Sequence, residues 1–118
     1  MDGMTRERLV ALLDRYLLRH FVWSKGQTVP GFDHSSWRKD VCGALMRWDN
    51  YGDRNSPYGW EIDHINPHGG DSPGNLQPLQ WQNNIAKSDG VIRREVTAIG
   101  WVNVRCSSTY PPNPFSSR

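Results

Sequence analysis

The segment from Trp60 to Gly90 places the strongest constraint on the fold, because its pattern predicts four short elements in succession. Apolar and polar residues alternate from Trp60 onward, which is typical of a half-buried strand, and Asn66-Pro67 ends that alternation. The predicted elements are a strand at 60–65, a glycine-rich loop, a second strand at 75–79 with Pro78 at its edge or end, and a helix at 81–88 closed by Asp89-Gly90. A strand, a loop, a strand and a helix within about thirty residues indicate a compact mixed unit.

The residues on either side of this segment predict further short elements. Apolar residues recur at three- and four-residue intervals behind Thr5, a suitable N-cap, which predicts an amphipathic helix. Residues 91–105 are ambiguous between helix and strand, and the strand interpretation is favoured. The predicted flanking elements are a helix from Thr5 to about His20, a second helix from Ser35 or Ser36 to between Asn50 and Gly52, and strands at 96–99 and 101–104.

Length and hydropathy limit the class of protein. A chain of 118 residues is sufficient for one domain with one modest core. We expect a small single α+β domain with N-terminal helices, divided into a helix and loop at 1–35, a core at 36–105 and a loose Ser- and Pro-rich tail at 106–118. No apolar stretch approaches the ~20 residues of a membrane span, and the N-terminus lacks the pattern of a secretory signal. We therefore expect a cytoplasmic protein with no membrane partner.

Composition excludes some kinds of site without identifying a partner. Cys42 and Cys106 are too few for a four-thiolate zinc site or a disulfide framework, and we expect two free thiols. The net charge of +2 is too small to indicate nucleic-acid binding by itself. Most of the six tryptophans are expected in the core, where aromatic side chains of small domains usually pack.

Three polar side chains of the strand and helix described above combine the groups that phosphodiester hydrolysis needs. The reaction requires a base for the attacking water and a cation against the charge of the phosphate. A neutral histidine accepts the proton, so His64 is the candidate base. Carboxylate and amide oxygens suit Mg²⁺ or Mn²⁺, so Asp63 and Asn84 are the candidate ligands. Because adjacent strand residues point to opposite faces, we expect Asp63 and His64 to approach one scissile phosphate from two sides.

The order and spacing of these residues resemble the HNH nuclease family. The matching sequence runs from Glu61-Ile62-Asp63-His64-Ile65 through Gly69-Gly70 and Asn75-Leu76-Gln77-Pro78-Leu79 to Asn83-Asn84-Ile85-Ala86-Lys87-Ser88-Asp89. The resemblance covers roughly residues 36–90. It implies a ββα-metal unit and hydrolysis of DNA to products with a 5′-phosphate and a 3′-hydroxyl. We therefore expect a metal-dependent endonuclease that acts on double-stranded DNA through one Mg²⁺ or Mn²⁺ ion.

The resemblance also assigns Asn75 and leaves two departures from the family pattern. Asn75 is implied to brace the loop that presents His64 through bonds to backbone groups, and it is counted with His64 as catalytic. Many family members carry zinc-knuckle cysteines five and eight residues after this Asn, where this chain has Gln80 and Asn83, so we expect no structural zinc. A His is common at the position of Asn84. Asn83 competes for the same assignment, but the nine-residue step from Asn75 favours Asn84.

Each of these residues also has a purely structural interpretation. His64 is alternatively a satisfied core histidine, and Asn75 an ordinary turn residue. For Asp63 and Asn84, the structural interpretations are a salt bridge and a helix cap. Glu61 shares strand parity with Asp63 and either adds a carboxylate near the cation or is an exposed strand residue.

Basic residues in and after the last helix are candidate DNA contacts. They are Lys87, which lies one turn after Asn84, and Arg93 and Arg94; each is alternatively a solvated surface charge. One site cuts one strand of a duplex, and the apolar stripe of the first helix has the width that a single core covers. We therefore expect a monomer that nicks DNA.

Two alternatives to a nuclease stay open at this point. The first is a non-catalytic DNA-binding module with the same fold, which metal-dependent cleavage would distinguish. The second is a structural zinc site made of Asp63, His64 and His68. Pro67 and Gly69-Gly70 argue against the helix that would bring the two histidines to one face.

Overall fold

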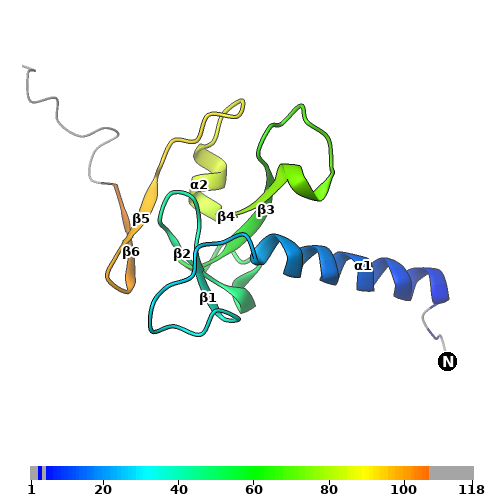
Figure 1. The fold of residues 1–118 in the computed structure, drawn as a ribbon. Helices are drawn as coiled ribbons and strands as arrows, with labels where there is room; N and C mark the ends of the chain where they lie inside the picture. Colours follow the sequence, from blue (N-terminus) through cyan, green and yellow to red (C-terminus); the bar gives the residue numbers. More distant parts are fainter. Residues whose placement is uncertain (1–2, 4, 107–118) are drawn as a thin grey trace, which may run out of the picture.

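The fold is of the mixed α+β class and is seen in a computed structural model that describes residue 3 and residues 5–106 (Figure 1). Within these residues, all strands pair as two-stranded antiparallel sheets: β1 with β2, β3 with β4, and β5 with β6. Beyond Cys106, the predicted tail lies outside the described residues. The elements are α1 (Arg6–Trp23), β1 (Trp37–Lys39), β2 (Leu45–Arg47), the 3₁₀ helix η1 (Trp48–Asn50), β3 (Trp60–His64), the 3₁₀ helix η2 (Pro73–Asn75), β4 (Leu76–Gln80), α2 (Trp81–Ala86), β5 (Val96–Ile99) and β6 (Val102–Arg105).

The predicted N-terminal helix is confirmed as α1. The hydroxyl of Thr5 caps it by accepting the backbone N–H of Arg8 at 3.1 Å, and the helix continues past His20 to Trp23. Only Val22 and Trp23 of this helix are buried, and the apolar face of the earlier turns is exposed. The expectation that one core covers this face is therefore wrong, because periodicity identifies an apolar face without identifying what covers it. Among the described residues, no helix combines the length and hydrophobicity that a membrane crossing requires.

The predicted second helix is wrong, since residues 37–50 form β1, β2 and η1 instead. The reason lies in the turn between the two strands. Gly43 adopts a φ of +85°, which a helix does not contain. The carboxylate of Asp40 accepts the backbone N–H groups of Cys42 and Ala44, both at 2.9 Å, and this side chain replaces the backbone acceptors of a helix.

The predicted strand, strand and helix of residues 60–88 are confirmed with small shifts in their bounds. β3 and β4 pair in antiparallel register, with Asp63 opposite Gln77. Pro78 lies within β4 rather than at its end, which is tolerated because a two-stranded sheet leaves one edge of each strand without a backbone partner. α2 follows β4 directly and ends at Ala86, because Lys87 is extended. The strand interpretation of residues 96–105 is also confirmed by β5 and β6.

The core forms where the C-terminal end of α1 meets the β3–β4 hairpin. Of the six tryptophans, Trp23 and Trp60 are buried, three are half-buried and Trp101 is 65% exposed, so the expectation that most of them lie in the core is met only in part. The two cysteines are free, as predicted, and burial raises the pKa of Cys42 to about 12. The buried cluster consists of Val22, Trp23, Met46, Trp60 and Leu76.

A second buried cluster is polar and joins α2 to two other parts of the chain. The side chain of Asn83, which has no exposed surface, donates to Asp40 Oδ2 and to the carbonyl of Val96, both at 3.0 Å. Its oxygen accepts the backbone N–H groups of Glu95 and Val96 at 2.8 Å. Gln80, also fully buried, caps α2 and donates its backbone N–H to Asp40. Burial raises the pKa of Asp40 against the opposing effect of these hydrogen bonds.

Candidate functional site

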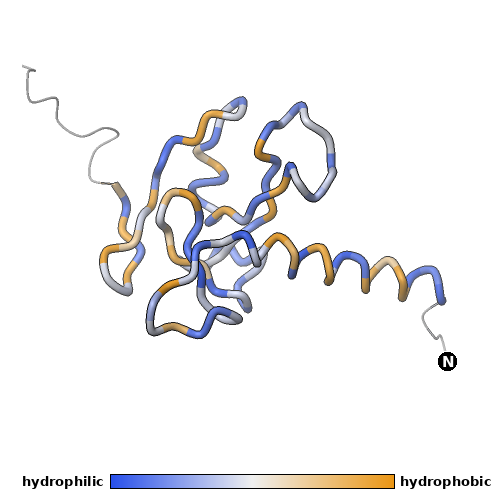
Figure 2. The backbone as a smooth tube through the Cα atoms, in the orientation of Figure 1, coloured by the Kyte–Doolittle hydropathy of each residue, from blue (hydrophilic) through white to orange (hydrophobic). Residues whose placement is uncertain are grey.

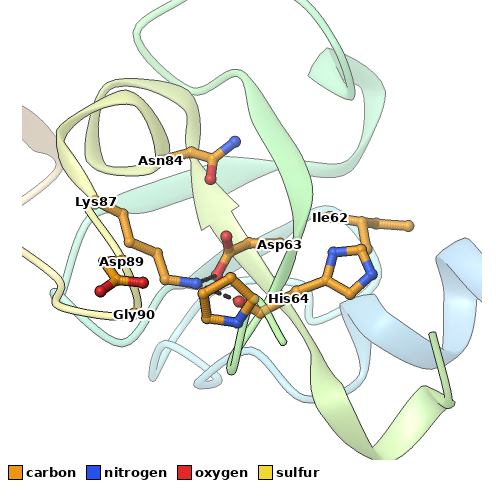
Figure 3. Close-up of a pocket in the computed structure, with 8 residues that line it drawn as sticks. Ile62, Asp63, His64, Asn84, Lys87, Asp89 and Gly90 are labelled. Carbon is orange, nitrogen blue, oxygen red and sulfur yellow. Dashed lines mark hydrogen bonds and ion pairs between the residues drawn. The ribbon is translucent and has the colours of Figure 1, made fainter. Parts of the chain in front are cut away.

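The hairpin and α2 enclose a cleft that contains most of the predicted site residues. Asp63 and His64 come from the end of β3, and Asn84 comes from the helix that packs on both strands of the hairpin. The cleft has a volume of about 380 Å³ and opens to solvent (Figure 3). Its lining residues are Ile62, Asp63, His64, Pro67, Asn84, Lys87, Asp89 and Gly90.

Asp63 is held in one position by two donors. Its Oδ2 atom accepts Lys87 Nζ at 2.8 Å and the amide of Gln77 at 2.9 Å. The carboxylate is 10% exposed, so this charge is largely removed from water and compensated by the Lys87 ammonium. Both contacts are on Oδ2, and no hydrogen bond to Oδ1 is present in the described part of the chain.

Lys87 faces inward, which bears on the predicted DNA contact. Its side chain is 6% exposed, and besides Asp63 its ammonium contacts the carbonyl oxygen of His64. The extended backbone of Lys87 produces this direction, because it turns the chain away from the axis of α2. A phosphate contact by Lys87 stays a prediction, and it would require the ammonium to leave Asp63.

Glu61 determines how the amide of Asn84 is oriented. Asn84 Nδ2 donates to Glu61 Oε1 at 2.8 Å, and only the nitrogen of an amide is able to donate to a carboxylate. The oxygen of Asn84 is therefore on the other side, and in Figure 3 it points toward Asp63. The sequence left Glu61 either as a carboxylate near the cation or as an exposed strand residue. The structure shows a third role, because Glu61 holds the side chain of Asn84, one of the two candidate cation ligands.

Glu61 is itself fixed by Arg54, a loop residue. The guanidinium donates to both carboxylate oxygens, at 2.7 and 2.9 Å, in the bidentate geometry typical of strong pairs. These hydrogen bonds from Arg54 lower the pKa of Glu61 below its ordinary value, and they raise that of Arg54. Glu61 is therefore an acceptor for Asn84 at neutral pH.

The imidazole of His64 and the carboxylate of Asp63 leave β3 in different directions, as strand alternation predicts (Figure 3). The ring is 43% exposed, which is inconsistent with a buried core histidine. Its Nε2 atom lies 2.7 Å from Oδ1 of Asp71, a loop residue whose carboxylate is 95% exposed. When Nε2 carries a proton, it donates to this carboxylate and Nδ1 is the basic atom.

Asn75 makes the side-chain to backbone bonds that the sequence interpretation describes. Its oxygen accepts the backbone N–H of Asn66 at 2.9 Å, and its nitrogen donates to the carbonyls of Asn66 and Gly70 at 2.9 and 2.8 Å. A Cβ atom on Gly69 would lie 2.9 Å from this nitrogen, so the amide occupies space that only glycine leaves free. These contacts close the loop that follows His64, whereas a catalytic contribution of Asn75 stays a prediction.

The oxygens that converge on the cleft fit a hard divalent cation. Asp63 Oδ1 and the Asn84 oxygen accept no hydrogen bond within the described residues, and both belong to the class of ligand that Mg²⁺ prefers. No cluster of three or more His, Cys, Asp or Glu side chains able to hold a metal is present among residue 3 and residues 5–106. The candidate site offers only two protein ligands, one carboxylate and one amide. Mg²⁺ commonly binds through so few protein ligands, because water and phosphate oxygens complete its octahedron.

The structure does not bring together the residues of the alternative zinc site. His68 is 81% exposed and lies 3.4 Å from Asp89, in the loop after α2, rather than beside Asp63. Residues 65–68 form a bend and a turn rather than a helix, and so the two histidines do not share a helix face.

The remaining candidate DNA contacts, Arg93 and Arg94, do not line the cleft. Arg93 and Arg94 are exposed, in the segment between α2 and β5. Besides the contacts of Lys87 with Asp63 and of Asn84 with Glu61, three others were not predicted from the sequence: Arg54 with Glu61, Asp71 with His64, and Gln77 with Asp63. Arg54 and Asp71 lie in loops without periodic signal, whereas strand pairing alone would have placed Gln77 opposite Asp63.

Comparisons with known proteins add no assignment to this geometry. The chain matches no protein-family model, no curated protein and no solved structure at a significant level.

Proposed function

We propose that this chain is an HNH-type endonuclease that uses one Mg²⁺ or Mn²⁺ ion to hydrolyse phosphodiester bonds of double-stranded DNA. The observation that carries the proposal is that Asp63, Asn84 and His64 all line one open cleft. The order β3, loop, β4 and α2 is consistent with the ββα-metal unit that the sequence resemblance implies.

Each candidate residue of the cleft has a separate role in the proposed hydrolysis. Asp63 and Asn84 would hold the cation, which would supply positive charge against the scissile phosphate and the leaving oxygen. His64 takes a proton from the water whose oxygen attacks phosphorus. The bond from phosphorus to the 3′-oxygen breaks and that oxygen takes up a proton from solvent water, so the products carry a 5′-phosphate and a 3′-hydroxyl. Asn75 keeps the loop after His64 in place.

Double-stranded DNA is the proposed substrate because the cleft is open and basic residues lie near it. The exposed Arg93 and Arg94 follow the cleft residue Gly90 by three and four positions in the sequence, and we propose that they contact the phosphate backbone. One cleft positions one water against one phosphate, so each cleft cuts one strand at a time.

A plasmid cleavage assay tests the proposal. Supercoiled plasmid is incubated with the purified chain and Mg²⁺, Mn²⁺, Ca²⁺, Zn²⁺ or a chelator, and the expected first product with Mg²⁺ or Mn²⁺ is open circle. His64→Ala should reduce the rate by about 10²–10⁴-fold while cation binding persists. Asp63→Ala and Asn84→Ala should weaken cation binding and nearly abolish cleavage.

A matched control comes from the same helix. Ile85 follows Asn84 directly, is 57% exposed and does not line the cleft, so Ile85→Ala should cleave at the wild-type rate. The proposal fails if the wild-type chain does not cleave with any of the cations, or if His64→Ala cleaves at a near-normal rate.

One contact favours a non-catalytic DNA-binding module as the second candidate function. The Lys87 ammonium already supplies a positive charge to Asp63 at 2.8 Å, so the carboxylate is compensated without a divalent ion. Such a module would bind duplex DNA in the presence of a chelator and would show no Mn²⁺ binding in titration calorimetry. An endonuclease of the proposed type should bind Mn²⁺ and lose this binding in Asp63→Ala.

A further inference from the structure

The N-terminal turns of α1 expose a continuous apolar face. The helix extends away from the rest of the molecule, and apolar residues recur along its projecting part (Figures 1 and 2). Only its C-terminal end is buried, at Val22 and Trp23. Seven large apolar side chains on it are between 47% and 57% exposed: Leu9, Val10, Leu12, Leu13, Tyr16, Leu17 and Phe21.

The exposed apolar residues form two neighbouring rows on the helix. Residues four apart stack along one face, so Leu9, Leu13 and Leu17 make one row, and Leu12 and Tyr16 make the row beside it. A groove runs between two such rows, and the commonest packing of two helices places a row of one into the groove of the other. Arg6 lies at the N-terminal end of this face, whereas Glu7, Arg8, Asp14 and Arg15 lie off it.

A helix with this composition requires a covering partner. An isolated helix of about 12 to 15 residues is marginal in water, and most helical stability in proteins comes from packing of an apolar face. Seven side chains that are each about half exposed present on the order of 600 Å² of apolar surface, the upper end of what monomers leave uncovered. Two copies that cover this face would together bury about 1,200 Å², which reaches the range of specific interfaces.

We propose that two copies of this chain associate through α1, with the row of Leu9, Leu13 and Leu17 of each copy seated in the groove of the other. The face fits itself because it carries both a row and a groove. The projection of α1 leaves room for a second helix to cross it (Figure 1). The chain's own continuation past β6 starts at the opposite side of the molecule from α1, which disfavours that segment as the cover (Figure 1). This association is independent of the proposed nuclease activity.

The mass of the full chain in solution tests the proposal. Light scattering after size-exclusion chromatography, over loading concentrations of 5–100 µM (about 0.1–1 mg/ml), should give about 27 kDa for the wild type, twice the 13.6 kDa of one chain. Leu13→Glu should give the mass of one chain, because a buried unpaired carboxylate opposes association. The matched control is Ala11→Glu, an equal charge change at an exposed position on the other side of α1, which should keep the double mass.

Three results would overturn the proposal. They are a single-chain mass for the wild type at every concentration, a double mass that Leu13→Glu does not reduce, and a single-chain mass for Ala11→Glu. A wild-type chain that stays single but binds lipid vesicles through this face gives the first of these results. Far-UV circular dichroism and tryptophan fluorescence check that each variant folds. If Leu13→Glu does not fold, Leu9→Glu, farther from the anchored end of α1, replaces it with the same expected mass.

Discussion

Replacing Asn83 by alanine removes the centre of the buried polar cluster, and we expect this substitution to be the most destabilising single change in α2. Four hydrogen bonds of the side chain are lost: two donated to Asp40 and Val96, and two accepted from Glu95 and Val96. Because Asn83 has no exposed surface, water does not reach its place without local opening of the structure.

The magnitude follows from the groups that are left behind. Three backbone groups lose their partner, namely the N–H of Glu95 and both the N–H and the carbonyl of Val96, whereas Asp40 Oδ2 keeps the N–H of Gln80. An unsatisfied buried group costs about 1–3 kcal/mol, and the N–H of Glu95 is only partly buried. The free energy of unfolding should therefore fall by about 3–6 kcal/mol. This is a large fraction of the free energy of unfolding of a typical domain, which is about 5–15 kcal/mol.

Urea denaturation followed by tryptophan fluorescence measures this loss. The matched control is Asn84→Ala, the same chemical change one residue later, where the side chain makes one partly buried bond to Glu61 and the expected loss is below about 1 kcal/mol. A wild-type-like unfolding curve for Asn83→Ala, within about 1 kcal/mol, would refute the reasoning that this cluster holds α2 in place.

A second substitution at the same position separates hydrogen bonding from volume. Asn83→Asp keeps the acceptor for Glu95 and Val96 but places a carboxylate oxygen where the amide donated to Asp40. Two adjacent buried carboxyl groups do not both ionise without a large cost, and so the pKa of the pair rises in the folded state. Since the folded variant then binds more protons, its stability should be lowest at neutral pH and recover on acidification toward about pH 5.

Three further predictions concern the cleft and its supports. Glu61→Ala removes the acceptor that orients the Asn84 amide and should weaken Mn²⁺ binding in titration calorimetry by about 10-fold or more; Arg54→Ala, which leaves the Glu61 acceptor in place, should bind nearly as well as wild type. Because hydrogen bonds from Arg54 lower the pKa of Glu61, the stability that this pair gives is present above the ordinary pKa of about 4.5 and is lost as the pH falls through the lowered value. Arg54 is more than half exposed, so urea unfolding should show only a small loss of stability in Arg54→Ala at pH 6, and this difference from wild type should shrink at pH 3. Asp71→Asn weakens the partner of His64 and should slow plasmid cleavage by about 10-fold without a change in Mn²⁺ binding; an unchanged rate would mean that the 2.7 Å contact does not position the imidazole.

The parts of the site that are fixed by local sequence could be predicted. Alternation in β3 places Asp63 and His64 in different directions, and a turn-rich loop followed by a strand brings α2 back over the hairpin. The spacing from Asn75 identified Asn84 as the residue that faces the cleft. These inferences depend on periods and distances along the chain, which the sequence states directly.

The parts that depend on contacts distant in sequence could not be predicted. The helical spacing of apolar residues in 37–50 competes with a turn at Gly43 and with the Asp40 carboxylate, whose partner Asn83 lies 43 residues later. The sequence predicts Lys87 on the surface of the helix, one turn after Asn84. In the structure its backbone is extended, and its ammonium lies against Asp63 instead. A buried charge of this kind becomes favourable only when a partner from another element is present, and the sequence alone does not identify that partner.

Asn83 and Asn84 link the stability of the fold to the chemistry of the cleft. Adjacent helical residues point about 100° apart, so the buried bonds of Asn83 fix the rotation of α2 and thereby direct Asn84 toward Asp63. Gln80 and Asn83 occupy the two positions where the sequence resemblance leads one to expect zinc-knuckle cysteines, and both are fully buried and hydrogen-bonded to the Asp40 cluster. The buried amides of Gln80 and Asn83 therefore anchor this helix to the Asp40 cluster. An Asn83 variant that still folds should consequently bind Mn²⁺ more weakly than wild type, although Asn83 itself does not line the cleft.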